Sequence, residues 1–244
     1  MLRTSSPPPR NVSWTRSSRP CAKTGGALER DRGRDARQSE SGWQHRIQSV
    51  FINVPFDSSY EPIFVTLVGT LVFLGQEPRC VLEVREQGDG RLLRIVELMR
   101  ACRMSIHDLS RAGTPARLNM PFELGLACAF KLMEPSSYEV FVFESRPHRI
   151  DRTLSDFKGR DPLIHSGTCH GMITCLLDVF VTDIPNPATE FRSAARELRQ
   201  SVRRTKQQTK TASLFRPMSF RLIVKAAINI ALDRGFIPRH PTGF

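Results

Sequence analysis

The chain has 244 residues, of which 40% are hydrophobic, and a formal net charge of +12. This length suits one domain of ordinary size with tails, or two small domains. No run of about 18 apolar residues occurs, so we predict no transmembrane helix, and we expect no membrane partner. The N-terminus lacks the apolar segment of a secretory signal.

The first 46 residues are rich in Arg, Ser, Pro and Gly. Such a composition cannot bury enough apolar surface to offset the entropy of ordering, so we predict a disordered basic arm over 1–46. The basic charge is concentrated at the two ends, with ten Arg and Lys against four Asp and Glu in 1–47, and twelve against two in 191–244. No aromatic-interleaved basic patch or zinc-ligand spacing accompanies this charge, and we therefore expect solvated ends without specific nucleic-acid recognition.

Apolar runs and helical periodicities alternate through the middle of the chain. Strands are predicted over 48–53, 78–83, 104–109 and 138–144, and helices over 58–74, 92–101, 121–132, 154–157, 171–181, 189–208 and 220–232. This order predicts an α/β fold with a flavodoxin-like parallel sheet and helices on both of its faces. The predicted domain covers 47–186. The basic helical segment 187–244 either packs on this domain or forms an oligomer contact.

Six cysteines are present, and no two of them form a C-x-x-C pair. Four lie in or beside apolar runs, where a reduced cysteine behaves as a small core residue. The sequence therefore predicts a reducing, cytoplasmic setting without a disulfide framework.

Candidate site residues lie at the ends of three predicted strands or in the segments that follow them, and they form three clusters. These candidates are Asn53, Pro55, Phe56 and Asp57 after the first strand, Glu83 after the second, and Asp108, Ser110, Asn119 and Glu123 after the third. A doubly wound sheet places its first and third strands side by side, so we expect the first and third clusters to meet at the carboxyl edge, where ligands bind in such sheets.

Structural roles are alternatives for several of these residues. Glu123 lies in the first turn of its helix, where a carboxylate favours the helix dipole. Asp108 is able to cap a turn, and Asn53 and Asp57 flank Pro55 as turn residues do. Arg79 and Glu83 are spaced to pair at a strand end.

Four motifs occur in order, F-I-N-V-P-F-D, E-P-R, I-H-D-L-S-R and N-M-P-F-E-L-G-L. Together they resemble a family of small bacterial proteins related to Toll/interleukin-1 receptor (TIR)-like domains and nucleoside 2-deoxyribosyltransferases. The resemblance covers roughly 50–178. It implies a TIR- or deoxyribosyltransferase-like domain that binds a nucleotide or nucleoside.

The resemblance also implies an activity and a set of roles. Glu123 resembles the helix-borne nucleophilic glutamate of those transferases, and Asp108 resembles the aspartate that follows an apolar strand. Cleavage of an N-glycosidic bond develops oxocarbenium character on the sugar, which a carboxylate traps or stabilises. The expected function is thus a nucleoside- or NAD-directed N-glycosidase or ribosyl transferase, with Glu123 and Asp108 as catalytic candidates. No metal or cofactor is expected, and NAD is a candidate substrate.

The remaining candidates are assigned to substrate binding. In this assignment Asn53 joins Asp108 in holding ribose hydroxyls, Asp57 is a lesser candidate for proton transfer, and small residues after Glu123, beginning with Gly125, let the helix lie close to the sheet. Two other functions stay open. One is a nucleotide-binding sensor without catalysis, and the other is a TIR-type interaction module that assembles as a homo-oligomer.

Overall fold

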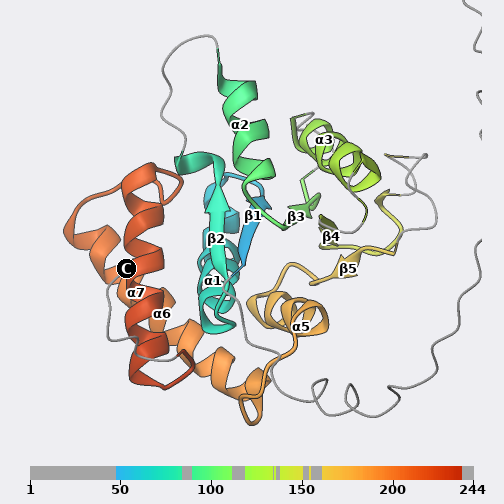
Figure 1. The fold of residues 1–244 in the computed structure, drawn as a ribbon. Helices are drawn as coiled ribbons and strands as arrows, with labels where there is room; N and C mark the ends of the chain where they lie inside the picture. The colour runs from blue at the N-terminus through green and yellow to red at the C-terminus, as the bar shows by residue number, and fades with distance from the viewer. Residues whose placement is uncertain are drawn as a thin grey trace, which may run out of the picture. The chain divides into compact units, whose positions relative to one another are not determined.

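Five parallel strands form one sheet in the order β2-β1-β3-β4-β5 (Figure 1). The computed structural model describes residues 48–83, 90–111, 119–133, 135, 138–150, 154 and 161–237. The strands are β1 (Ser49–Asn53), β2 (Glu77–Cys80), β3 (Met104–Asp108), β4 (Glu139–Glu144) and β5 (Leu163–Ile164). This order confirms the predicted flavodoxin-like α/β fold, with β1 beside β3 and Asn53 in register with His107.

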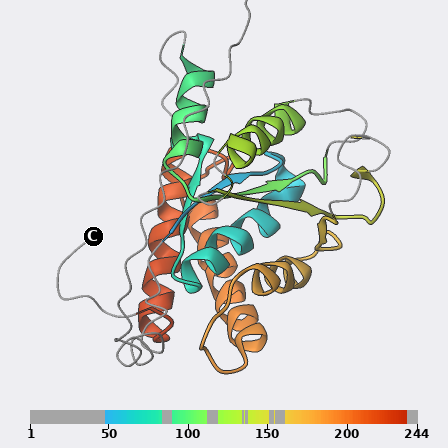
Figure 2. The same cartoon turned by 45° about the vertical axis from the view of Figure 1, so that its right-hand side comes forward.

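Helices cover both faces of the sheet. They are α1 (Glu61–Phe73), α2 (Arg91–Arg100), α3 (Asn119–Met133), α5 (Cys169–Val179), α6 (Pro187–Gln208) and α7 (Pro217–Asp233). Helix α1 contacts α5, α6 and α7, whereas α2 and α3 contact each other. Figure 2 shows α3 on one side of the strands, with α1 and α5 on the other.

Helix α1 is the centre of the larger core. Every residue from Ile63 to Phe73 is buried, which is more than the single apolar face that most helices bury. The difference arises because α1 lies between the sheet and the helices α5, α6 and α7, so water reaches neither side. Gly69 permits this packing, since an added Cβ would lie 2.4 Å from the Leu198 side chain of α6.

Alternation along β1 sends side chains into two separate cores. On β1, Val50 and Ile52 enter the core formed with α1, α5, α6 and α7. Phe51 points the opposite way and packs with Ile95 and Met99 of α2. This alternation has a period of two residues, and it also decides which polar side chains meet at the carboxyl edge.

The structure differs from the prediction in two strands. The second strand was expected to run to Glu83 but ends at Cys80, and 81–83 form a 3-10 turn. The turn is closed by Glu83, whose carboxylate accepts the Cys80 N–H at 2.9 Å and pairs with Arg79 at 2.8 Å. The two-residue strand β5 was not predicted, because Leu163 and Ile164 alone form too short an apolar run to be recognised.

The C-terminal helices pack on α1 in the same compact unit as the sheet, which spans His45–Phe244. Within the described ranges, no helix is long and apolar enough to cross a membrane. The predicted disordered arm 1–46 and most of the predicted helix 154–157 lie outside the described residues.

Candidate functional site

The carboxyl ends of β1 and β3 carry two polar clusters on opposite faces of the sheet. Asp108 extends from β3 toward α1 and β5, on the same side as Ile106. His107 extends to the other side, where its ring lies 6.1 Å from that of Phe51. We name these groups the Asp108 cluster (Asp108, Tyr60, Ser110 and His165) and the Glu123 cluster (Glu123, Asn119, Asn53 and His107).

The Asp108 carboxylate is fully buried and accepts hydrogen bonds from three residues. One oxygen accepts the backbone N–H of Ser110 at 2.8 Å. The other accepts the Tyr60 hydroxyl and lies 3.0 Å from Nε2 of His165. Burial opposes ionisation, but the hydrogen bonds from His165, Ser110 and Tyr60 outweigh it and hold the pKa of Asp108 below its ordinary value.

His165 is fixed in one tautomer by the loop that follows it. Its Nδ1 accepts the backbone N–H of Gly167 at 3.1 Å, so the ring proton lies on Nε2. That same Nε2 lies 2.9 Å from the Ser110 hydroxyl as well as 3.0 Å from Asp108. A Ser-His-Asp relay needs the serine and the aspartate at different ring nitrogens, and this cluster therefore does not form a nucleophilic serine.

On the other face, Asn53 joins the end of β1 to the first turn of α3. Its side-chain nitrogen donates to the carbonyl oxygen of Met120 at 3.2 Å and lies 3.2 Å from Nδ1 of His107. Burial lowers the pKa of His107 to about 3, which keeps the ring neutral with its proton on Nε2. Among the described residues this Nε2–H has no acceptor. Through its hydrogen bond to the Met120 carbonyl, Asn53 positions the first turn of α3, which carries Glu123.

Glu123 extends from the first turns of α3 and is 7% exposed. Burial raises the pKa of its carboxyl group to about 7, against the opposing effects of the Arg91 charge and a hydrogen bond with the Asn119 side chain. A carboxyl group with a pKa near neutrality is suited to proton transfer or to attack on an electron-poor carbon, because both of its forms are populated.

The small residues after Glu123 differ in what they do. Ala127 is fully buried. Gly125 is exposed, and an added Cβ there would meet nothing within 4 Å. The prediction that Gly125 lets α3 approach the sheet is wrong, because this residue lies on the outer side of the helix.

The other predicted site residues make structural contacts. Asp57 caps the turn that precedes α1, accepting the Tyr60 N–H at 3.1 Å, and pairs with Arg111 at 3.2 Å. Phe56 stacks on Phe215 with ring centroids 5.0 Å apart. Pro55 is buried beside them. Glu83 closes the turn after β2, and the loop 84–89 that follows it lies outside the described residues.

Tyr60 and His165 were not among the sequence candidates. Tyr60 lies in a turn rather than directly after a strand, so no sequence pattern predicted it as a site residue. His165 follows β5 and precedes Thr168, which caps α5 by accepting the Gly171 N–H at 2.9 Å. The sequence L-I-H-S-G-T therefore holds a strand end followed by a helix cap, a pattern that identifies His165 once β5 is recognised.

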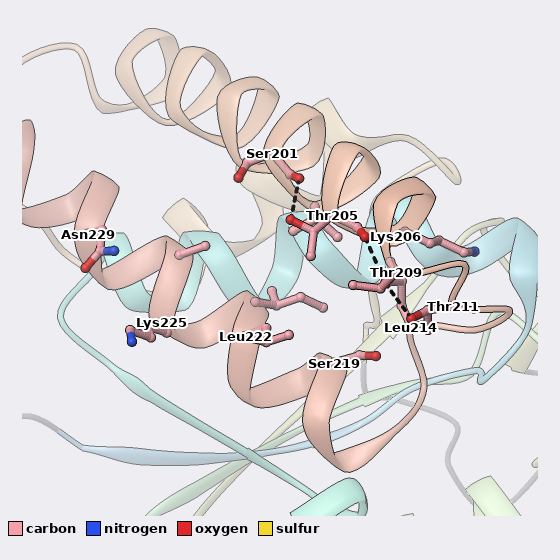
Figure 3. Close-up of a pocket in the computed structure, with 13 residues that line it drawn as sticks. Ser201, Thr205, Lys206, Thr209, Thr211, Leu214, Ser219, Leu222, Lys225 and Asn229 are labelled. Carbon is pink, nitrogen blue, oxygen red and sulfur yellow. Dashed lines mark hydrogen bonds between the residues drawn. The ribbon is translucent and has the colours of Figure 1, made fainter.

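A groove of about 270 Å³ lies elsewhere, between α6 and α7 (Figure 3). Ser201 and Thr205 of α6 face Lys225 and Asn229 of α7 across it. Its lining contains hydroxyl, amide and ammonium groups but no carboxylate or imidazole. None of the predicted site residues lies in this groove. Within the described part of the chain, no three His, Cys, Asp or Glu side chains gather as metal ligands do.

Neither the models of known protein families nor the curated proteins give a match to this chain. The resemblance to TIR-like and deoxyribosyltransferase-related proteins thus remains a prediction, and functional conclusions depend on the fold and on the two clusters.

Proposed function

We propose that this protein cleaves the N-glycosidic bond of a nucleoside or of NAD, with Glu123 as the group that meets the anomeric carbon. The observation that carries the proposal is a buried carboxyl group with a pKa of about 7 at the carboxyl edge of a parallel sheet. Ligands bind at this edge in open α/β sheets. The resemblance of the N-M-P-F-E-L-G-L motif to a glutamate-bearing helix supports the same residue.

The proposed reaction begins when the bond between C1′ and the base nitrogen breaks and its electron pair leaves with the base. The sugar becomes electron-poor at C1′, and the ionised Glu123 carboxylate stabilises it or forms an ester bond to it. Water then adds to C1′, the ester oxygen returns to Glu123 as carboxylate, and the proton from water goes to solvent. In the transferase version, a second base replaces water.

In this proposal the other residues position the machinery. Asn53 holds the Met120 carbonyl and with it the first turn of α3. Asp108 has zero exposure and three protein donors. We therefore assign Asp108 to positioning Tyr60 and His165, in place of the direct contact with ribose hydroxyls that the resemblance implies. The five described cysteines are unpaired, which agrees with the proposed cytoplasmic location.

The test is release of free base from NAD and from a mixture of deoxynucleosides, followed by chromatography. Wild type is compared with Glu123→Gln and with Glu97→Gln, a matched change on the exposed side of α2. The proposal predicts release by wild type and by Glu97→Gln but not by Glu123→Gln. Equal release by all three would contradict it.

A nucleotide sensor is the second candidate. It is favoured by the Asp108 carboxylate, which is buried and already hydrogen-bonded within the protein. A carboxylate that already has three protein donors is suited to holding a fold rigid, as a binding module requires. A sensor would be stabilised against heat by a nucleotide that it leaves intact. Thermal unfolding with nucleosides and dinucleotides, with analysis of the recovered ligand, separates binding from cleavage. Light scattering on the same samples detects the self-assembly that a TIR-type module would show.

A further inference from the structure

Helix α6 carries a row of basic side chains along one face. The row consists of Arg192, Arg196, Arg199, Arg203 and Lys206, which we name the α6 basic stripe. The spacings alternate between four and three residues, which places all five on one side of an α-helix. At 1.5 Å per residue the stripe is about 21 Å long.

Carboxylates neutralise only one end of this stripe among the described residues. Lys206 pairs with Glu61 at 2.6 Å. Arg199 donates to the Thr66 hydroxyl at 2.8 Å, which leaves its charge uncompensated. Arg196 and Arg203 are exposed and have no partner in the described part of the chain.

The acidic residues of α6 lie apart from the stripe. Glu190 and Glu197 are seven residues apart and both pair with Arg234 at the end of α7, at 3.7 and 2.7 Å. The basic stripe therefore contains no acidic residue, whereas the acids lie on the side of α7, where Arg204 follows Glu197 by seven residues. A helix face that served only for solubility would not require five basic residues in a row without an acid among them.

We propose that the α6 basic stripe binds the phosphate backbone of a nucleic-acid duplex without reading its sequence. Arginine presents a planar fork that bonds two phosphate oxygens at once, and four of the five stripe residues are arginine. A duplex offers a continuous row of phosphates, which a straight stripe of this length can follow. Contacts of this kind position a protein on the duplex and carry no sequence information.

An anionic membrane fits the stripe less well. A helix that lies in a membrane interface inserts an apolar face among the lipids. The apolar face of α6 is already buried in the protein core, through Phe191, Ala194, Ala195, Leu198 and Val202. The exposed side of α6 is instead charged, for example at Arg196 and Arg203. The proposal is independent of the chemistry at Glu123.

The experiment measures fluorescence anisotropy of a labelled duplex of about 20 base pairs with the full chain, over a range of salt concentrations. The test variant is Arg196→Glu with Arg203→Glu. The control is Arg221→Glu with Lys225→Glu, two exposed residues of α7 outside the stripe, which changes the net charge by the same amount. The basic residues of 1–47 are unchanged in both variants, so their contribution cancels in the comparison.

At about 0.1 M salt we expect the stripe variant to bind at least about tenfold more weakly than wild type, and the control to stay within about threefold. The slope of the logarithm of affinity against the logarithm of salt concentration should become shallower by about two in the stripe variant only. Equal losses in both variants would overturn the proposal, because net charge alone would then explain binding. Absence of duplex binding by wild type, or binding only to vesicles of anionic lipid, would overturn it as well.

Discussion

Asp108 and Glu123 lie on opposite faces of the sheet edge. Asp108 meets Tyr60 of the α1 side and His165 after β5, whereas Glu123 extends from α3 on the side of α2. The sequence places both near the carboxyl edge but does not reveal that the two carboxylates belong to different clusters. Their environments also shift the two pKa values in opposite directions, which assigns a permanent charge to Asp108 and a titrating group to Glu123.

The Glu123 carboxyl group should make stability fall as the pH rises. Its pKa is raised from 4.5 in the unfolded chain to about 7 in the folded protein, so the folded state binds more protons between these values. Ionisation should therefore lower the free energy of unfolding by up to about 3 kcal/mol between about pH 4.5 and 7. Glu123→Gln should remove this loss and melt at a higher temperature than wild type at pH 7, as measured by thermal unfolding. A lower melting temperature for this variant, with Glu97→Gln unchanged, would contradict the claim that burial disfavours the ionised Glu123 carboxylate.

His107 should have the opposite effect. Its pKa falls from 6.5 in the unfolded chain to about 3 in the folded protein, so the unfolded state binds more protons between these values and stability rises with pH. The two slopes oppose each other between about pH 4.5 and 6.5, and Glu123→Gln should expose the His107 slope. Adding His107→Gln, which keeps an acceptor for Asn53, should flatten the profile again. Urea unfolding at a series of pH values measures the dependence of stability on pH for wild type, Glu123→Gln and the double variant. If the profile of Glu123→Gln were as flat as that of the double variant, the lowered pKa of His107 would be contradicted.

The Asp108 cluster should behave as one network. Asp108→Asn presents an amide N–H where Tyr60 and His165 already donate, and we expect a loss of about 2–4 kcal/mol in the free energy of unfolding. Tyr60→Phe should cost about 1–2 kcal/mol, and the double variant should cost less than the sum of the two. Chemical unfolding of the four proteins tests this coupling. Additive losses would mean that Tyr60 and Asp108 act independently.

Two glycines provide a matched pair of substitutions. An added Cβ at Gly171 would lie 2.1 Å from the carbonyl oxygen of His165, so Gly171→Ala should force the start of α5 away from the Asp108 cluster. We expect a loss of more than about 2 kcal/mol, since backbone cannot move aside as a flexible side chain does. Gly125→Ala on the exposed side of α3 should instead stabilise the protein by about 0.5–1 kcal/mol. Thermal unfolding of both variants decides this, and similar effects in the two would contradict the close approach at His165.

The layout of the sheet could be predicted from the sequence because its long elements have clear periods. The run from Val50 to Ile52 is continuous, β-branched and aromatic, as central parallel strands are. The burial of α1 on all sides could not be predicted, since it depends on α6 and α7, more than 100 residues later in the chain. Two-residue β5 had no detectable pattern.

The candidate site was predictable in part. Strand ends indicated Asn53 and Asp108 as candidates, and the resemblance of the helix motif indicated Glu123, but neither revealed the partners of these residues. Tyr60 and His165 reach Asp108 across 48 and 57 residues of sequence, and only the folded chain brings these groups together. Which face a polar residue occupies depends on strand register, which a one-residue shift would reverse.

The most direct test of Glu123 as the reacting group is the pH dependence of base release by wild type, measured by chromatography from about pH 5 to 9. The rate should rise about tenfold per pH unit below about pH 7 and level off above it, because only the ionised carboxylate stabilises or attacks C1′. A rate that is flat through pH 7, or no base released at any pH, would contradict the proposal that the ionised Glu123 carboxylate is the reacting group.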